Sequence, residues 1–131
     1  MMSVSLYAAI LAVALVALSV RVIRLRRRYE ISLGHENNSQ LERAIRVHAN
    51  FTEYAPFFLI MLALAEIQGM QPAYVHGFGT CFLAARTAHF VGLRSPDAPG
   101  IYRVLGMALT FAAIGLVSVI LLLQYLDSLI S

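Results

Sequence analysis

Hydrophobic positions gather in long runs that short polar segments separate. Two uncharged runs, Val4 to Val20 and Val104 to Leu126, have the length of a membrane-spanning helix, which needs about 17–25 residues. Two shorter runs, Ala55 to Ala65 and Ala73 to Ala85, reach that length once polar residues beside them are included. The pattern therefore predicts four spanning helices, at about residues 3–29, 40–67, 72–93 and 100–129.

Polar, flexible residues separate the first two of these helices. The segment SLGHENNSQ, residues 32–40, is rich in Gly, Asn and Ser, which favour loops. Asn38 or Ser39 is suited to cap the following helix, and Glu42 completes a capping-box pattern with Ser39. Short connections make neighbouring helices antiparallel. The expected fold class is all-α: an up-down four-helix membrane bundle that forms a single domain over residues 1–131.

The composition supports a lipid environment, because 60% of the residues are hydrophobic, against about 45–50% in soluble domains. The segment from Arg21 to Arg46 carries seven arginines against three glutamates, and Arg94 and Arg103 flank the third connection. The positive-inside rule then places both connections in the cytoplasm and both termini on the other side. No charge precedes the first run, so it is expected to be a retained anchor. Nucleic acid is not an expected partner.

Polar side chains interrupt the second and third predicted helices near the cytoplasmic side. Arg46, Asn50 and Glu53 have i, i+4, i+7 spacing and share one face, while Arg86 and His89 follow on the third helix. A charge in mid-membrane costs about 2.5–3.5 kcal/mol on insertion scales, so such groups face a partner or a wet cavity.

Two interpretations of these polar residues remain open. In the first, Arg46 extends to the membrane surface, and Glu53 forms a structural ion pair with Arg86. Alternatively, the residues line a pocket for a small zwitterion, with arginines on its carboxylates and Glu53 on its amine. The histidines and acids lack metal-ligand spacing, so no metal is expected.

Small residues recur on the third predicted helix. Ala84, Ala88 and Gly92 are each four residues apart. This pattern lets helices approach closely in lipid, within one subunit or between subunits.

The stretch RAIRVHANFTEYAPFF, residues 43–58, resembles the second-helix signature of membrane-associated proteins in eicosanoid and glutathione metabolism, the MAPEG family. That family includes microsomal glutathione transferases, prostaglandin E synthase and leukotriene C synthase. Its pattern of Arg, Asn, Glu and Pro matches Arg46, Asn50, Glu53 and Pro56, and Tyr54 is similar to the leukotriene synthase version. Weaker matches, IRLRRR, ARTAHF and an arginine opening the fourth helix, extend the resemblance over nearly the whole chain.

The resemblance implies a homotrimer that binds glutathione as cosubstrate between adjacent subunits, near the cytoplasmic side. Arg103 matches the arginine that stabilises the glutathione thiolate, which makes it the candidate catalytic residue. Arg86 matches a helix-three arginine and is the candidate counter-ion of Glu53. The residues that the resemblance assigns to glutathione contact are Arg24, Arg46, Asn50, Glu53, Tyr54 and His89.

The chain also departs from the family pattern. Well-studied members often carry Tyr four residues after the position of His89, where this chain has Leu93, and Tyr102 is the candidate replacement. The first cytoplasmic connection is short, which argues against prostaglandin or leukotriene synthesis. A simpler member of bacterial type, in the inner membrane, is expected.

The implied activity is that of a glutathione transferase or peroxidase. A thiol has a pKa near 8.5, and lowering it by two units takes about 2.7 kcal/mol of preference for the anion. The thiolate would attack lipophilic electrophiles or hydroperoxides that arrive from the membrane lipids. The alternatives are a non-catalytic binding protein of the same fold, a structural or assembly protein, and a small transporter subunit.

Overall fold

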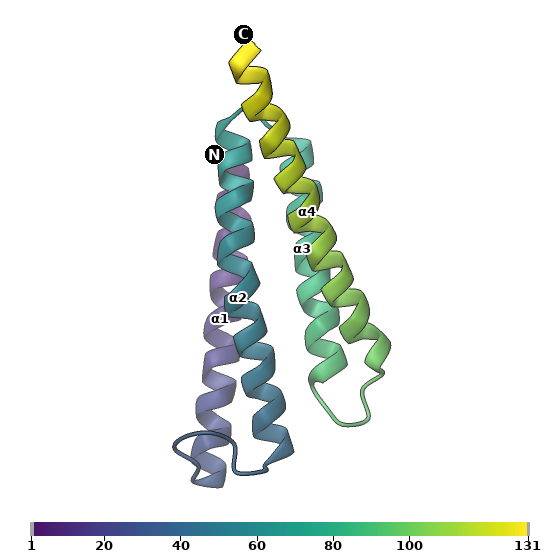
Figure 1. The fold of residues 1–131 in the computed structure, drawn as a ribbon. Coiled ribbons are helices and arrows are strands. Elements are labelled where there is room, and N and C mark those ends of the chain that lie inside the picture. Colours follow the sequence, from purple (N-terminus) through teal and green to yellow (C-terminus); the bar gives the residue numbers. More distant parts are fainter. Residues whose placement is uncertain (1, 131) are drawn as a thin grey trace.

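Four long helices make up the protein. The structure, a computed structural model, describes residues 2–130. Its elements are α1 (Met2–Tyr29), α2 (Ser39–Ile67), α3 (Pro72–Leu93) and α4 (Gly100–Ile130) (Figure 1). The described residues contain no strand, which confirms the all-α prediction. Each helix boundary lies within one residue of the position expected from the hydropathy pattern.

The helices run antiparallel, with α1 beside α2 and α3 beside α4 (Figure 1). α2 also contacts α3 and α4, and α1 contacts α3, whereas α1 and α4 make no close backbone contact in the described range. We call the end with connections 30–38 and 94–99 the loop end, and the end with both termini the terminal end. The two helix pairs lie together at the terminal end and diverge toward the loop end (Figure 1).

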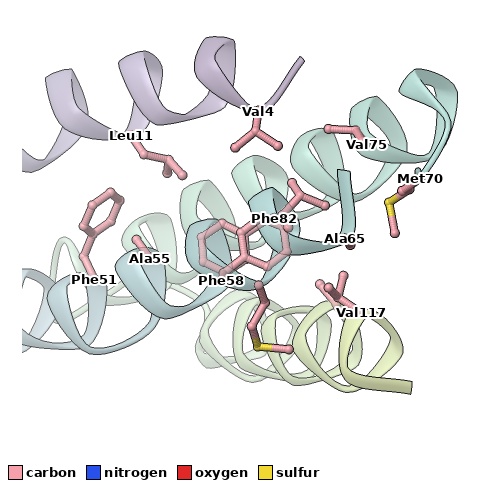
Figure 2. Close-up of a cluster of buried hydrophobic side chains, with 13 residues drawn as sticks. Val4, Leu11, Phe51, Ala55, Phe58, Ala65, Met70, Val75, Phe82 and Val117 are labelled. Carbon is pink, nitrogen blue, oxygen red and sulfur yellow. The ribbon is translucent and has the colours of Figure 1, made fainter. Parts of the chain in front are cut away.

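The hydrophobic core occupies the terminal half of the bundle. Phe58 of α2 stacks on Phe82 of α3, with ring centroids 4.0 Å apart and planes 2° from parallel (Figure 2). Leu62, Val75 and Val117 are fully buried around this pair. A separate, smaller cluster joins α1 to α2 at the loop end. Apolar packing therefore holds all four helices together at one end only, and leaves room between the pairs at the other.

Glu66 connects the end of α2 to the beginning of α1. Its carboxylate oxygens accept from the backbone N–H groups of Ser3 and Val4, at 3.1 and 3.3 Å. The first N–H groups of a helix have no partner within the helix and carry partial positive charge, so a carboxylate stabilises them.

Tyr7 connects α1 to α3 at the same end. Its buried hydroxyl lies 3.0 Å from both the carbonyl oxygen and Nδ1 of His76, and 3.2 Å from Thr80 Oγ1. The ring lies so close to Gly79 that a Cβ there would be 2.5 Å from ring carbons. Glycine at position 79 therefore lets the aromatic side chain of α1 lie directly on α3.

α3 and α4 make the closest helix contact of the bundle. A Cβ on Gly106 would lie 2.6 Å from the backbone nitrogen of His89 and 2.7 Å from the carbonyl oxygen of Ala85. Gly92 is similarly covered by the backbone of Arg103. Of the expected small-residue stripe, Gly92 lies in this contact, Ala88 is half-buried and Ala84 is exposed.

Three helices, α1, α2 and α4, are long and apolar enough to cross a membrane. Their outer faces carry large apolar side chains; Val13, for example, is 72% exposed. Such a surface is unfavourable in water and suits lipid. The third helix, α3, is not in this group, contrary to the expectation from its length, because it includes His76, Arg86 and His89. Its 22 residues still extend about 33 Å, close to the thickness of a bilayer core.

Candidate functional site

A polar cavity of about 620 Å³ opens between α2 and α4 in the loop half of the bundle. We call it the polar cavity. Its walls come from α2 and α4, and α3 closes it from behind. The residues that line it are Ser39, Glu42, Arg43, Arg46, Asn50, His89, Leu93, Arg103, Val104 and Met107.

Helical spacing explains why the polar side chains gather in this cavity. Arg43, Arg46 and Asn50 occupy positions i, i+3 and i+7 of α2, so they form one row on the side that faces α4. Arg103 lies in the first turn of α4, where its backbone packs on Gly92. His89, only 5% exposed, reaches the cavity from α3.

The cavity has an excess of positive charge. Arg43, Arg46 and Arg103 line it, against the single carboxylate of Glu42. The Nε atom of Arg43 is buried and has no hydrogen-bond partner among the described residues. A buried N–H without an acceptor is unfavourable, and an anionic ligand would supply one. The chemistry of the walls therefore favours a molecule with carboxylates or another anionic group.

Arg86 cross-links three helices behind the cavity. It is 6% exposed, and its Nη1 donates to Asn50 Oδ1 of α2 at 2.5 Å. Its Nη2 donates to the hydroxyl of Thr110 on α4, and that hydroxyl donates in turn to the carbonyl of Gly106 at 2.7 Å. These bonds occupy the Asn50 oxygen and orient its side chain at the edge of the cavity.

The structure gives Arg86 neutral partners in place of the expected carboxylate. Glu53 is exposed, and no ion pair joins it to Arg86 among the contacts of the described residues. The guanidinium instead lies 5.8 Å from the ring centre of Tyr54 and 5.6 Å from that of Phe82. Hydrogen bonds to two neutral oxygens and to the Met107 sulfur, together with contact with aromatic rings, thus surround this buried cation.

Comparison with known proteins identifies the family. The MAPEG family model matches residues 4–123. The chain belongs to the MAPEG family. It is also 36% identical over 88 residues to the inner membrane protein YecN of Escherichia coli strain K12, an alignment that covers 67% of each chain. The YecN protein of Escherichia coli O6:H1 matches with the same identity and coverage.

MAPEG membership makes this chain an integral membrane protein of a family that includes glutathione transferases. Four of the residues expected to act at a MAPEG glutathione site, Arg46, Asn50, His89 and Arg103, line the polar cavity together. Leu93, at the position where the expected family pattern has a tyrosine, lines it too. The fold of a single chain therefore brings together expected site residues from α2, α3 and α4.

Four other expected MAPEG site residues lie outside this cavity. Glu53 is exposed, and Tyr102 is 44% exposed on the first turn of α4. Tyr54 packs edge-on against Phe111 of α4, with ring centroids 5.6 Å apart. Arg24 is exposed on α1, the helix that makes no close contact with α4. Within the chain these four side chains do not join the polar cavity.

Arg43 and Met107 line the polar cavity but were not among the residues that the MAPEG signature indicated. Arg43 is three residues before Arg46, so it lies on the same helical face, and the i, i+3 spacing was visible in the sequence. Met107 of α4 was missed because nothing in the sequence shows how α4 is rotated relative to α2. Among the described residues, no group of three or more His, Cys, Asp or Glu could hold a metal ion.

Proposed function

We propose that the protein is a glutathione transferase or peroxidase of the membrane, and that the polar cavity binds the glutathione. The observation that carries the proposal is the gathering of Arg43, Arg46 and Arg103 around one cavity that contains a single carboxylate. Glutathione has two carboxylates, one amine and one thiol, so it is a net anion and becomes a dianion when its thiol ionises.

Arginines on α2 suit the carboxylates of glutathione. Arg43 and Arg46 present forked N–H groups that can hold carboxylates through paired hydrogen bonds. Asn50 lies beside them with its oxygen bonded to Arg86, which leaves its amide N–H₂ available as a donor. The row on α2 would therefore fix the peptide backbone of glutathione along the helix.

Arg103 is the proposed catalytic residue. It is the cavity arginine on α4, and it stands opposite the row on α2. A guanidinium that donates to the sulfur favours the thiolate over the thiol, and two pKa units require about 2.7 kcal/mol. Val104 and Met107 line the cavity next to Arg103 and provide an apolar wall on which a lipophilic substrate could approach the sulfur.

The remaining residues of the MAPEG pattern fit a homotrimer. Arg24 lies on α1, away from α4, so it can reach a polar cavity only as part of another copy of the chain. Glu53 and Tyr102 are exposed in the single subunit and are available at a subunit contact. We place the glutathione site between subunits, in the cytoplasmic leaflet, with Glu53 on the amine.

A thiolate difference spectrum tests this function. Purified protein in detergent is mixed with glutathione at neutral pH, and the ultraviolet absorbance of the thiolate is recorded. With the thiol pKa lowered by two units from 8.5, about three quarters of the bound glutathione would be ionised at pH 7; Arg103→Ala should reduce this to about 3%. Arg94→Ala is the matched control, because Arg94 is exposed and lies outside the cavity.

Binding of radiolabelled glutathione, measured in parallel, separates the alternatives. Binding without a thiolate band in the unmodified protein would contradict the enzyme and favour a binding protein of the same fold. Absence of binding would assign the polar residues to assembly of the bundle. A band that Arg103→Ala and Arg94→Ala reduce equally would contradict the role of Arg103.

A further inference from the structure

A second cavity, of about 370 Å³, lies on the other side of the bundle, between α1 and α3. We call it the apolar groove. Its walls are mostly aliphatic and aromatic, and include Leu11 and Ala14 of α1, Phe51 of α2 and Phe90 of α3. His89 borders both this groove and the polar cavity, so α3 separates the two. The volume lies within the range of about 300–1,000 Å³ that is usual for small-molecule sites.

Two arginines of the groove have a buried N–H without an acceptor. The guanidinium of Arg21 lies 5.2 Å from the ring centre of Phe90, and its Nη2 donates to the carbonyl of Arg94 at 3.3 Å, but its Nη1 is buried and unpaired among the described residues. Arg86 lines the groove as well, and its Nε is unpaired in the same way.

Charge in the apolar groove is therefore not balanced within the subunit. The described residues that line it include no Asp or Glu. Arg21 is half-buried and Arg86 is buried, and a cation without an anionic partner is unfavourable in surroundings of low dielectric constant. An anion that enters the groove would supply an acceptor for Arg21 Nη1, and Arg86 adds positive charge to the same groove.

The shape of the groove limits which anion fits. Its α1 wall extends from Arg21 to Ile10, which is about 16 Å along the helix axis, or half of a bilayer core. Arg21 lies next to the arginine-rich end of α1, where the helix meets the membrane surface. A ligand would thus have its charge at the surface and an apolar chain pointing toward the middle of the bilayer.

We propose that the apolar groove binds a single-chain fatty-acid carboxylate, with the carboxylate accepting from Arg21 Nη1 and the chain lying between α1 and α3. This site uses residues other than those of the polar cavity, His89 excepted, and it does not depend on glutathione binding.

The test compares dodecanoate with dodecanol, which has the same chain and no charge. Native mass spectrometry of the full-length protein in a non-ionic detergent counts bound ligands over a concentration series. Dodecanoate should bind more tightly than dodecanol. Arg21→Gln should weaken dodecanoate at least about tenfold and leave dodecanol unchanged, since a hydrogen bond to a charged group is lost.

Two further variants keep the proposal falsifiable. Arg27→Gln removes the same charge from an exposed position of α1 outside the groove and should leave both affinities unchanged. Ala17→Phe adds bulk at the groove wall and should weaken both ligands.

Other results would overturn the assignment. These are equal affinity for the acid and the alcohol in the unmodified protein, equal effects of Arg21→Gln and Arg27→Gln, or tighter binding of an anionic phospholipid with two chains. A change in the number of subunits caused by Ala17→Phe would show that a second copy covers the groove, and would also contradict the proposal.

Discussion

Arg86 shows what a single buried charge does in this bundle. It is the residue that ties α2, α3 and α4 together, through Asn50 and Thr110. Its importance was visible in the sequence, because a charge within an apolar run needs a partner. The partner was not visible: Thr110 became one only through the rotation of α4 about its axis, which places that hydroxyl toward α3. Arg46, Asn50 and His89 were expected near one another from their spacing and their depth in the membrane, whereas the joining of Arg103 to them had to come from the family pattern.

Thr110→Val should therefore destabilise the protein more than its small size suggests. The side chains have nearly the same shape, but valine removes the acceptor of a buried guanidinium, a loss of about 1–3 kcal/mol in the free energy of unfolding. Reversible unfolding in mixed micelles measures it. Thr87→Val is the control, because the Thr87 hydroxyl is exposed and bonds only to the carbonyl of Leu83 in its own helix. Equal effects of the two substitutions would contradict the importance of the Arg86 network.

At the scale of elements, the helices were predictable and their contacts were not. Long apolar runs bounded by Gly, Pro and Asn set the helix limits, and Asn38 caps α2 by accepting from the N–H of Leu41 at 2.9 Å. Ser39, the other expected cap, is instead the first helical residue. Small-residue spacing on α3 was also visible, and its Gly92 does lie against α4, but the matching contact at Gly106 of α4 was not expected. Contact between helices depends on which helix faces meet. The hydropathy pattern does not identify those faces here, because helices surrounded by lipid are apolar on their outer faces as well.

Gly106→Ala should force α3 and α4 apart. The new methyl group would lie 2.6 Å from a backbone nitrogen, and backbone atoms cannot move aside as a flexible side chain can. Overpacking of this kind costs about 1–3 kcal/mol in the free energy of unfolding. The midpoint of thermal unfolding in detergent should fall accordingly.

Gly115→Ala is the control for this test, because it should change the free energy of unfolding in the opposite direction. Apart from the adjoining backbone of α4 itself, no described atom lies within 4 Å of a Cβ at Gly115, which is also in α4. Alanine is the better helix former by about 0.8–1.0 kcal/mol, so this variant should be slightly stabilised. A Gly106→Ala protein as stable as Gly115→Ala would show that the helices are not held as closely as described.

At the scale of the whole molecule, the bundle is closed at one end and open at the other. Apolar stacking, the Glu66 carboxylate and the Tyr7 hydroxyl join the helices at the terminal end. The polar cavity lies toward the loop end, where the helix pairs diverge (Figure 1), and the apolar groove extends from the middle of α1 toward the same end. The closed end therefore acts as the support that fixes the geometry of the open end.

Tyr7→Phe tests that support. The substitution keeps the ring on Gly79 and removes a hydroxyl that contacts His76 and Thr80, so the free energy of unfolding should fall by about 1–2 kcal/mol. Tyr74→Phe, at a tyrosine that is 62% exposed, should have no measurable effect. Chemical denaturation of the two variants side by side would reveal a difference, and its absence would remove Tyr7 from the support.

The bond between Tyr7 and His76 also has a consequence for how the protein is made. The two residues are 69 positions apart, and ribosomes add about 5–20 residues per second. For roughly 3 to 14 seconds after Tyr7 is synthesised, its partners on α3 do not yet exist. During that interval a nascent α1 released into hydrocarbon would carry an unsatisfied hydroxyl, which is unfavourable there. Retention of α1 by the insertion machinery until α3 emerges would spare the chain that state, and would couple the order of helix release to the order of translation through one tyrosine.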